Sequence, residues 1–325
     1  MKKIIIFLIS TLIIIFLLLN KIDKKDNDNT INVSEVTHSV FYAPWYVSIE
    51  NGYFKDENIN INLSLTPGAD KVAASILSGD SQIGFSGPEA TIYVFNNSKE
   101  KLITFASLTK RDGQFIVGDC KYKDKFKMED LIGKKILAGR TGGMPLMMFE
   151  YALKKSNINL DEVKINTSVD FSGLTGAYIG GQADFVNLFE PNATAIEKQK
   201  YGCVLSSLGQ ITGSVPYTTF YAKEEFINNN KDLIYRFNKA LNRGLKYVKE
   251  NDSKTIAKTI ANQFPDTTVS DLTKLVERYK EADSWYDSTY ININDYDRLI
   301  EIMINGNSLK KKIPIEALIT NEFNK

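Results

Sequence analysis

Histidine and cysteine are the scarcest reactive residues in this chain of 325 residues. It contains one histidine, His38, and two cysteines, Cys120 and Cys203. Metal sites built from imidazole and thiolate ligands need about four such side chains close together, so the composition predicts no such metal site. A nucleophilic Ser–His or Cys–His pair would have to use His38 itself. The composition therefore disfavours metalloenzymes with His and Cys ligands and enzymes with a Ser–His or Cys–His nucleophile. We expect no cofactor.

An excess of charge of either sign is also missing. The chain has 40 Lys and Arg residues and 39 Asp and Glu residues, which gives a formal net charge of +1. Nucleic-acid-binding domains carry a strongly basic surface, and this balance does not indicate one. The composition therefore predicts a small-molecule or protein partner and no nucleic acid. We expect the chain to act as a monomer.

The N-terminus departs from ordinary globular composition. Two lysines precede an uncharged apolar run at 4–19. As a helix this run would be roughly 24 Å long, slightly less than the roughly 30 Å hydrocarbon core of a bilayer. Residues 1–20 are predicted to be a secretory signal or a membrane anchor, and the anchor is favoured because no small-x-small cleavage site follows. Residues 21–34 are predicted to be a polar tether, which places the remainder outside the cytoplasm at the cell membrane.

After about residue 35 the chain alternates between short apolar runs and amphipathic segments. The predicted strands are 35–42, 61–67, 81–87, 102–108, 134–139, 183–189 and 202–208. The predicted helices between them are 43–54, 70–80, 88–97, 144–156, 170–181 and 191–200, and four more follow Tyr217 at 231–251, 253–264, 269–283 and 294–306. This alternation predicts an α/β fold with mainly parallel sheets. Two α/β series followed by a helical return predict two lobes.

Four stretches carry a resemblance to a known family. They are "FYAPWYVSIENGYFKDENINI", "SQIGFSGPEATI", "GKKILAGRTGGMP" and "ADFVNLFEP", in this order. Together they resemble the solute-binding proteins of ABC importers, in the branch that binds thiamine pyrimidine precursors, alkanesulfonates, taurine or nitrate. The resemblance covers about residues 35–320. The chain departs from many Gram-positive members because no cysteine for lipidation follows the apolar run.

The resemblance implies a two-lobed clamshell of the type II periplasmic-binding-protein fold, whose lobes close on a ligand. Lobe 1 would contain residues 35–113 and 215–325, and lobe 2 would contain residues 114–214, with crossings near Gly113 and Pro216. The resemblance also implies a receptor without enzymatic activity. Its partners would be a small organic ligand and the transmembrane subunits of an ABC permease with its cytoplasmic ATPase.

The first candidate site residues follow the first predicted strand. Ligands in doubly wound lobes bind outside the carboxyl ends of the strands. Tyr42 and Trp45 are placed there, and we expect both to stack on a ligand or cover it. Tyr46, Ile49 and Tyr53 share one stripe of the following helix, which assigns them to the core.

Two further junctions offer backbone N–H groups at the start of a helix. At the first of them Gly87 allows close approach of the backbone, and Glu89 either contacts the ligand or interacts with the helix dipole. The second is a glycine-rich loop that lacks both the P-loop ending and the dinucleotide fingerprint, but whose N–H groups can bind an anion. The candidates in this loop are Arg140, Thr141 and Gly142.

The last candidates follow the strand at 183–189 and the return crossing. Asn187 and Glu190 precede a helix that begins near Pro191. Glu190 resembles the acidic cleft residue of the family, and the alternative is a helix-dipole role. Tyr217 lies on the return crossing and is the remaining candidate.

Five residues receive structural expectations. Arg111 and Asp112 are expected to pair with each other at the hinge. His38 lies on an alternating stretch and is expected to be structural. Cys120 and Cys203 allow a disulfide, but their spacing does not decide the matter, and two separate cysteines are favoured.

The candidate residues indicate the kind of ligand. Aromatic rings, an acid, a base and backbone amides together suit a polar heteroaromatic, and a thiamine pyrimidine precursor is favoured. Riboflavin-like and purine-like rings satisfy the same argument, and sulfonate, taurine or nitrate remain alternatives. A membrane-anchored sensor is a second functional class. A pyrimidine-precursor synthase shares the fold, but it depends on a cysteine-rich motif and on histidine chemistry, which this chain lacks.

Overall fold

The structure is a computed structural model that describes residues 29–324. The predicted signal or anchor at 1–20, and most of the predicted tether, lie outside these residues. Within the described range, no helix has the length and apolar character needed to cross a bilayer.

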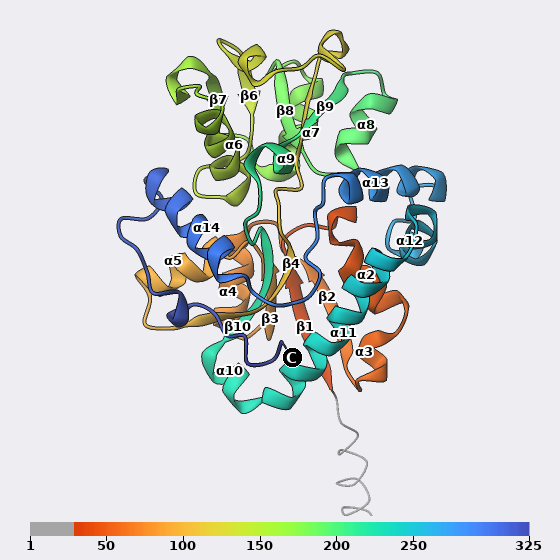
Figure 1. The fold of residues 1–325 in the computed structure, drawn as a ribbon, viewed down its shortest axis with the longest axis vertical. Coiled ribbons are helices and arrows are strands. Elements are labelled where there is room, and N and C mark those ends of the chain that lie inside the picture. Colours follow the sequence, from red (N-terminus) through yellow and green to blue (C-terminus); the bar gives the residue numbers. More distant parts are fainter. Residues whose placement is uncertain (1–28, 325) are drawn as a thin grey trace, which may run out of the picture.

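Two five-stranded sheets organise the molecule, one in each of two lobes (Figure 1). The strands of lobe 1 lie in the order β2-β1-β3-β10-β4, and those of lobe 2 in the order β7-β6-β8-β5-β9. The strands of lobe 1 are β1 (Thr30–Glu35), β2 (Asn60–Leu65), β3 (Ile83–Ser86), β4 (Leu102–Thr109) and β10 (Thr218–Lys223). The strands of lobe 2 are β5 (Phe115–Gly118), β6 (Lys135–Leu137), β7 (Lys164–Asn166), β8 (Phe185–Leu188) and β9 (Cys203–Ser207).

Helices cover both faces of each sheet, as the alternating sequence predicts. The helices between the strands of lobe 1 are α2 (Ala43–Glu50), α3 (Tyr53–Asp56), α4 (Ala69–Ser78) and α5 (Glu89–Asn97). Those of lobe 2 are α6 (Met144–Lys155), α7 (Leu174–Ile179), α8 (Asn192–Lys198) and α9 (Leu208–Thr212). The C-terminal segment supplies α10 (Glu224–Asn229), α11 (Lys231–Glu250), α12 (Ser253–Ile260), α13 (Val269–Glu281) and α14 (Ile293–Asn305). The predicted helices are thus confirmed, with ends shifted by a few residues.

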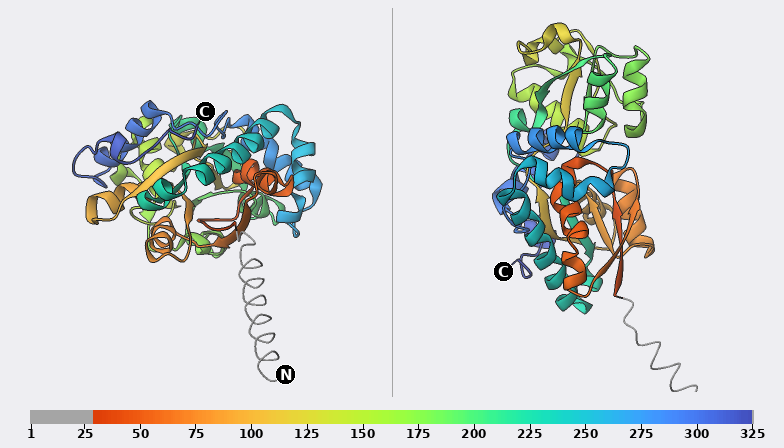
Figure 2. Two further views of the ribbon diagram at one scale, coloured as in Figure 1. Left: turned by 90° about the horizontal axis from the view of Figure 1, so that it is seen from below. Right: turned by 90° about the vertical axis from the view of Figure 1, so that its right-hand side faces the viewer.

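Both sheets are mixed, because one strand in each runs against its neighbours. β10 pairs antiparallel with β3 and β4, and β5 pairs antiparallel with β8 and β9. β4 leads from lobe 1 into β5, and the chain returns from α9 into β10. The antiparallel strands are therefore the first strand after each crossing. Figure 2 shows the two lobes from the side, stacked along the long axis.

The first strand begins earlier than the sequence pattern predicts. β1 covers Thr30–Glu35, so the range assigned to the tether contributes most of an interior strand of lobe 1, next to the edge strand β2. Ile31 and Val33 are buried, and their period of two was hidden between polar neighbours. The segment at 36–42 is not a strand, since the chain turns there into a short 3₁₀ helix at Val40–Tyr42 that Ser39 caps.

His38 has the structural role that the sequence predicts. Its Nδ1 lies 2.7 Å from a carboxylate oxygen of Glu35, and its Nε2 lies 2.8 Å from the carbonyl oxygen of Gln263. Tyr46 also donates to Glu35, at 3.0 Å. His38 therefore ties the end of β1 to the segment that follows α12.

The expectation of two separate cysteines is wrong, because Cys120 and Cys203 form a disulfide. The register of lobe 2 explains the pairing. β5 and β9 are adjacent, with Gly118 opposite Cys203, so Cys120 lies just beyond the end of this ladder. Sequence spacing alone contains no information on that register.

The expected pair of Arg111 with Asp112 is also wrong. Arg111 instead pairs with Asp283, with 3.1 Å between Nη2 and Oδ2. Asp112 is buried and accepts a hydrogen bond from the backbone N–H of Gln114 at 2.7 Å. The two side chains therefore have different partners, Asp283 for Arg111 and the backbone of Gln114 for Asp112.

Candidate functional site

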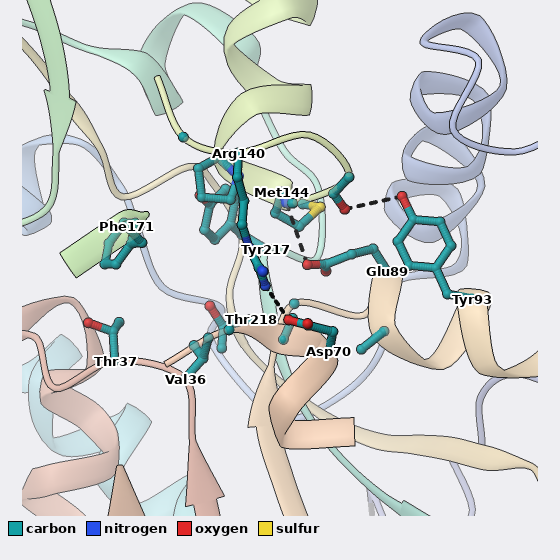
Figure 3. A pocket seen from close by; sticks show the side chains of 18 of the residues that line it. Val36, Thr37, Asp70, Glu89, Tyr93, Arg140, Met144, Phe171, Tyr217 and Thr218 are labelled. Carbon is teal, nitrogen blue, oxygen red and sulfur yellow. Dashed lines mark hydrogen bonds and ion pairs between the residues drawn. The ribbon is translucent and has the colours of Figure 1, made fainter. Parts of the chain in front are cut away.

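A cavity of about 280 Å³ lies between the two lobes. Lobe 1 contributes the ends of β1 and β3, the start of α4 and the start of α5, whereas lobe 2 contributes the loop between β6 and α6. These positions are carboxyl ends of parallel strands, which is where doubly wound lobes bind ligands. Figure 3 shows side chains from both lobes pointing into this space.

Aromatic rings form much of the wall of this cavity. The rings are those of Tyr42, Tyr93, Phe171, Phe189 and Tyr217. Tyr42, Phe189 and Tyr217 are almost fully buried, and burial raises the pKa of the Tyr42 and Tyr217 phenols. Both phenols therefore stay neutral at physiological pH and offer an O–H group beside an apolar ring.

Glu89 is the acid of the cavity. It is the first residue of α5, and its exposed fraction is 2%. Its Oε1 accepts a hydrogen bond from the N–H of Met144 at 3.4 Å, whereas Oε2 has no hydrogen-bond partner among the described residues. Burial raises the pKa of this carboxyl to about 7, since the charged form loses its hydration.

The conformation of Glu89 depends on Gly87. A Cβ atom at position 87 would lie 2.0 Å from Glu89 Oε2 and 2.8 Å from Cγ of Met144. A side chain there would therefore displace the carboxylate. The glycine lets the carboxylate fold back over the end of β3 toward lobe 2.

Direct contacts join the two lobes at the edge of the cavity. Arg140 of lobe 2 pairs with Asp70 at the start of α4, and the O–H of Tyr93 donates to the carbonyl oxygen of Gly142 at 3.1 Å. Figure 3 shows Arg140 reaching down to Asp70. The structure thus has its lobes closed over the cavity.

The structure brings most of the predicted site residues together. Those that line the cavity are Tyr42, Gly87, Glu89, Arg140, Thr141, Gly142 and Tyr217. They come from separate parts of the chain and from both lobes. Trp45, Asn187 and Glu190 do not line it.

Trp45 is a core residue, contrary to expectation. Its exposed fraction is 0%, and its ring packs among Phe54, Phe85 and Phe237. α2 packs against α12 and against α11, where Gly244 allows the two backbones to approach closely. Side chains on both sides of α2 are therefore buried, so Trp45 belongs to the core although it lies outside the predicted core stripe.

Glu190 and Asn187 do not line the cavity, and each contacts a neighbouring element instead. Glu190 is buried and pairs with Arg278 of α13 at 2.5 Å, and it also accepts from the N–H of Thr194 at 2.9 Å. Asn187 is buried as well, and its backbone carbonyl oxygen accepts a hydrogen bond from the side-chain amide of Gln114. At this junction the residue that reaches the cavity is Phe189.

Several lining residues were missed by the sequence analysis. The main ones are Thr37, Asp70, Tyr93, Phe171 and Phe189. Tyr93 follows Glu89 by four residues on one helix, so the two share a face, and this signal was available. Phe171 lies in a 3₁₀ turn before α7, where no pattern indicates a site.

The described residues contain no group of three or more His, Cys, Asp or Glu side chains arranged to hold a metal ion. The cavity lining includes neither His38 nor the two cysteines. Its chemistry is that of a binding site, with rings, hydroxyl groups, one acid, one ion pair and backbone amides.

The sequence matches the model of a known protein family over most of its length. The family model described as NMT1/THI5 like matches residues 40–255. The chain belongs to the NMT1/THI5-like family. The matched range of this family includes both sheets of the structure, except for β1.

A relative in Bacillus subtilis (strain 168) supports the assignment to the NMT1/THI5-like family. It is YtlA, which is named as a candidate binding protein. It is 36% identical over 295 residues, which cover 90% of this chain and 88% of YtlA.

Solved structures show the same fold at low sequence identity. The alkanesulfonate-binding protein SsuA from Xanthomonas axonopodis pv. citri, bound to MOPS, has a TM-score of 0.72 at 13% identity and covers 90% of this chain and 98% of its own. The periplasmic nitrate-binding protein NrtA from Synechocystis PCC 6803 has a TM-score of 0.71 at 11% identity, with coverages of 91% and 87%. A Candida albicans protein described as having the generic periplasmic-binding-protein fold has a TM-score of 0.67 at 12% identity, with coverages of 90% and 96%. This likeness shows that the chain has the periplasmic-binding-protein fold.

Proposed function

We propose that this protein captures a small nitrogen heteroaromatic solute outside the cytoplasm and delivers it to an ABC importer. The favoured ligand is a thiamine pyrimidine precursor. One observation carries the proposal, namely the aromatic cavity between two lobes that holds a buried carboxylate oxygen without a partner. Its partners are the permease subunits with their ATPase, and the protein acts as a monomer attached to the membrane by its N-terminal segment.

The size of the cavity supports a small ligand. Pockets for drug-sized ligands measure roughly 300–1,000 Å³, and this cavity of about 280 Å³ lies just below that range. One aromatic ring with short substituents suits such a volume better than the three fused rings and sugar-alcohol chain of riboflavin. The rings of Tyr42, Phe189 and Tyr217 offer faces and edges for stacking on it.

The charge of the cavity argues against nitrate and sulfonates. An anion needs unpaired donors or a free positive charge. Arg140 is the one cationic side chain among the described residues of the lining, and Asp70 already pairs with it. A bound anion would also lie near the Glu89 carboxylate. The SsuA and NrtA structures share the fold, and we infer a different ligand for this chain.

The disulfide supports a location outside the cytoplasm. Disulfides such as Cys120–Cys203 persist in oxidising compartments and are rare in the cytoplasm of mesophiles. The absence of histidine and cysteine from the described lining also supports a receptor over a pyrimidine-precursor synthase. A membrane-anchored sensor has the same cavity, and neighbouring genes for a permease and an ATPase would favour transport over sensing.

A thermal-shift screen of the purified full chain tests the proposed ligand class. A ligand that binds only the folded state raises the melting temperature. We expect the aminopyrimidine precursor of thiamine to raise it, and taurine, an alkanesulfonate and nitrate to leave it unchanged. A shift with an anion and none with the pyrimidine would contradict the proposal, and a shift with riboflavin alone would replace the favoured ligand.

A further inference from the structure

The carboxylate of Glu89 has no counter-ion within the part of the chain that the structure describes. Its Oε2 lacks any hydrogen-bond partner among the described residues, and its Oε1 has one long bond from a backbone N–H. A buried carboxylate without compensation is costly. Such a group persists at a binding site when the ligand supplies the missing partner.

No side chain of residues 29–324 supplies a free cation to Glu89. Arg140 is held by Asp70 at the edge of the cavity, and the remaining lining side chains near Glu89 are neutral. Tyr93 directs its O–H to Gly142 and not to Glu89. The compensating charge or donor must therefore come from the solute.

The aromatic wall points to the same ligand chemistry. Electron-rich ring faces attract cations, and this attraction is stronger where water is excluded. Tyr42, Tyr93, Phe171, Phe189 and Tyr217 surround the space in front of Glu89. A carboxylate at one end of an aromatic enclosure suits a planar cation that has N–H donors in its plane.

We propose that Glu89 makes this site selective for protonatable amidine-type N-heterocycles, which bind as cations paired with the Glu89 carboxylate. The proposal rests on the proposed function and adds the charge state of the bound solute. A neutral aminopyrimidine that enters a site with protonated Glu89 takes the proton from Oε2 onto a ring nitrogen. The O–H bond breaks, an N–H bond forms, and the product is a carboxylate–amidinium pair with no other reactant.

This mechanism predicts a specific pH dependence of affinity. Because burial holds the pKa of Glu89 at about 7 in the empty site, one proton is available below that pH without uptake from solvent. Above it, binding must take a proton from solvent, so affinity falls as pH rises. At a pH below the pKa of the free ring, both the ring and Glu89 carry a proton before binding. Binding must then release one proton to solvent, so affinity falls again as pH decreases. The neighbouring groups are the Asp70 carboxylate, the Arg140 guanidinium and the phenols of Tyr42, Tyr93, Tyr217, Tyr221 and Tyr296.

Calorimetric titration of the full chain with the aminopyrimidine precursor of thiamine tests the proposal. The wild type should show a maximum of affinity just below about pH 7, and Glu89→Gln should lower affinity about ten- to a hundredfold and abolish the decline above that pH. The oxo analogue, in which a carbonyl group replaces the amino group, should bind about as weakly to the wild type as the amine binds to the variant. Glu57→Gln is the matched control, since Glu57 is a buried acid far from the lining that pairs with Lys239.

A second readout separates loss of binding from loss of folding. Glu89→Gln removes a charge that burial disfavours, so the empty variant should be at least as stable as the wild type above about pH 7. Equal affinity of the wild type and Glu89→Gln with the same pH profile would overturn the proposal while leaving the proposed function intact. Absence of aminopyrimidine binding to the wild type would overturn the proposed function itself.

Discussion

Tyr42 and Trp45 lie three residues apart and have different neighbours. Tyr42 is the last residue of the short 3₁₀ helix, with its ring on the cavity wall and 4.4 Å between its centroid and that of Phe85. Trp45 packs against Phe237 of α11 and is not among the residues that line the cavity. One residue therefore contributes to the site and the other to stability.

Substitutions at these two positions should separate the two roles. Trp45→Ala should lower the free energy of unfolding by about 3–5 kcal/mol, because it leaves a large cavity in the core. Trp45→Phe should keep ligand affinity within about twofold, whereas Tyr42→Ala should lower it about tenfold or more. Urea unfolding and calorimetric titration measure the two effects. A loss of affinity in Trp45→Phe equal to that in Tyr42→Ala would show that the division is wrong.

Individual residues also show how far the sequence predicts the site. Glu89 and Arg140 could be predicted because each follows a strand end, at the edge of the sheet where such lobes bind ligands. Glu190 also follows a strand end, but its side chain turns to Arg278, which is 88 residues away in sequence. No local sequence pattern indicates which of two neighbouring helices or strands a side chain will contact.

At the scale of elements, the Cys120–Cys203 disulfide fastens the edge of the sheet in lobe 2. It joins the segment after β5 to the start of β9 across 83 residues of sequence. Removing it with Cys120→Ala and Cys203→Ala should lower the free energy of unfolding by about 4–5 kcal/mol, on the chain-entropy account of such a loop.

Urea unfolding with and without reductant measures this contribution. The reductant should destabilise the wild type and leave the double variant unchanged. An equal midpoint for the oxidised wild type and the double variant would contradict a stabilising role.

The same scale shows what the sequence could and could not predict of the fold. Helices such as α6 and α11 were predicted because their apolar residues recur with a helical period. β1 was placed too late, because its short alternation lies within a polar segment. The antiparallel direction of β5 and β10, and the register that joins the cysteines, depend on contacts between distant segments. These contacts are not recorded in any short stretch of sequence.

At the scale of the whole molecule, side-chain contacts at several places hold the lobes together. At the cavity edge Asp70 pairs with Arg140, and at the other edge Arg278 of α13 contacts Glu190 and Glu197 of lobe 2. Figure 1 shows α13 beside α8 at the level between the lobes. The exposed fractions of Asp70 and Arg140 are 63% and 38%, so solvent and salt screen the first pair. The contacts of Arg278 include the fully buried carboxylate of Glu190, so solvent and salt screen them less than the Asp70–Arg140 pair.

The Asp70–Arg140 pair should bias the lobes toward closure only weakly. Exposed ion pairs contribute about 0–1 kcal/mol, which corresponds to at most about a fivefold change in the closing equilibrium. Asp70→Asn should therefore increase the radius of gyration of the ligand-free protein in small-angle scattering, and ligand should reverse the change. Asp232→Asn removes a similar exposed pair within α11 and should have no effect. An unchanged radius in Asp70→Asn would exclude the pair as a latch.

A crystal structure of the complex with the aminopyrimidine precursor of thiamine tests the central claim most directly. The account predicts the ring between the lobes, against the wall that includes Tyr42 and Tyr217, with its nitrogen atoms within hydrogen-bond distance of the Glu89 carboxylate. A ligand bound elsewhere, or a bound ring that leaves Oε2 of Glu89 without a partner, would contradict it.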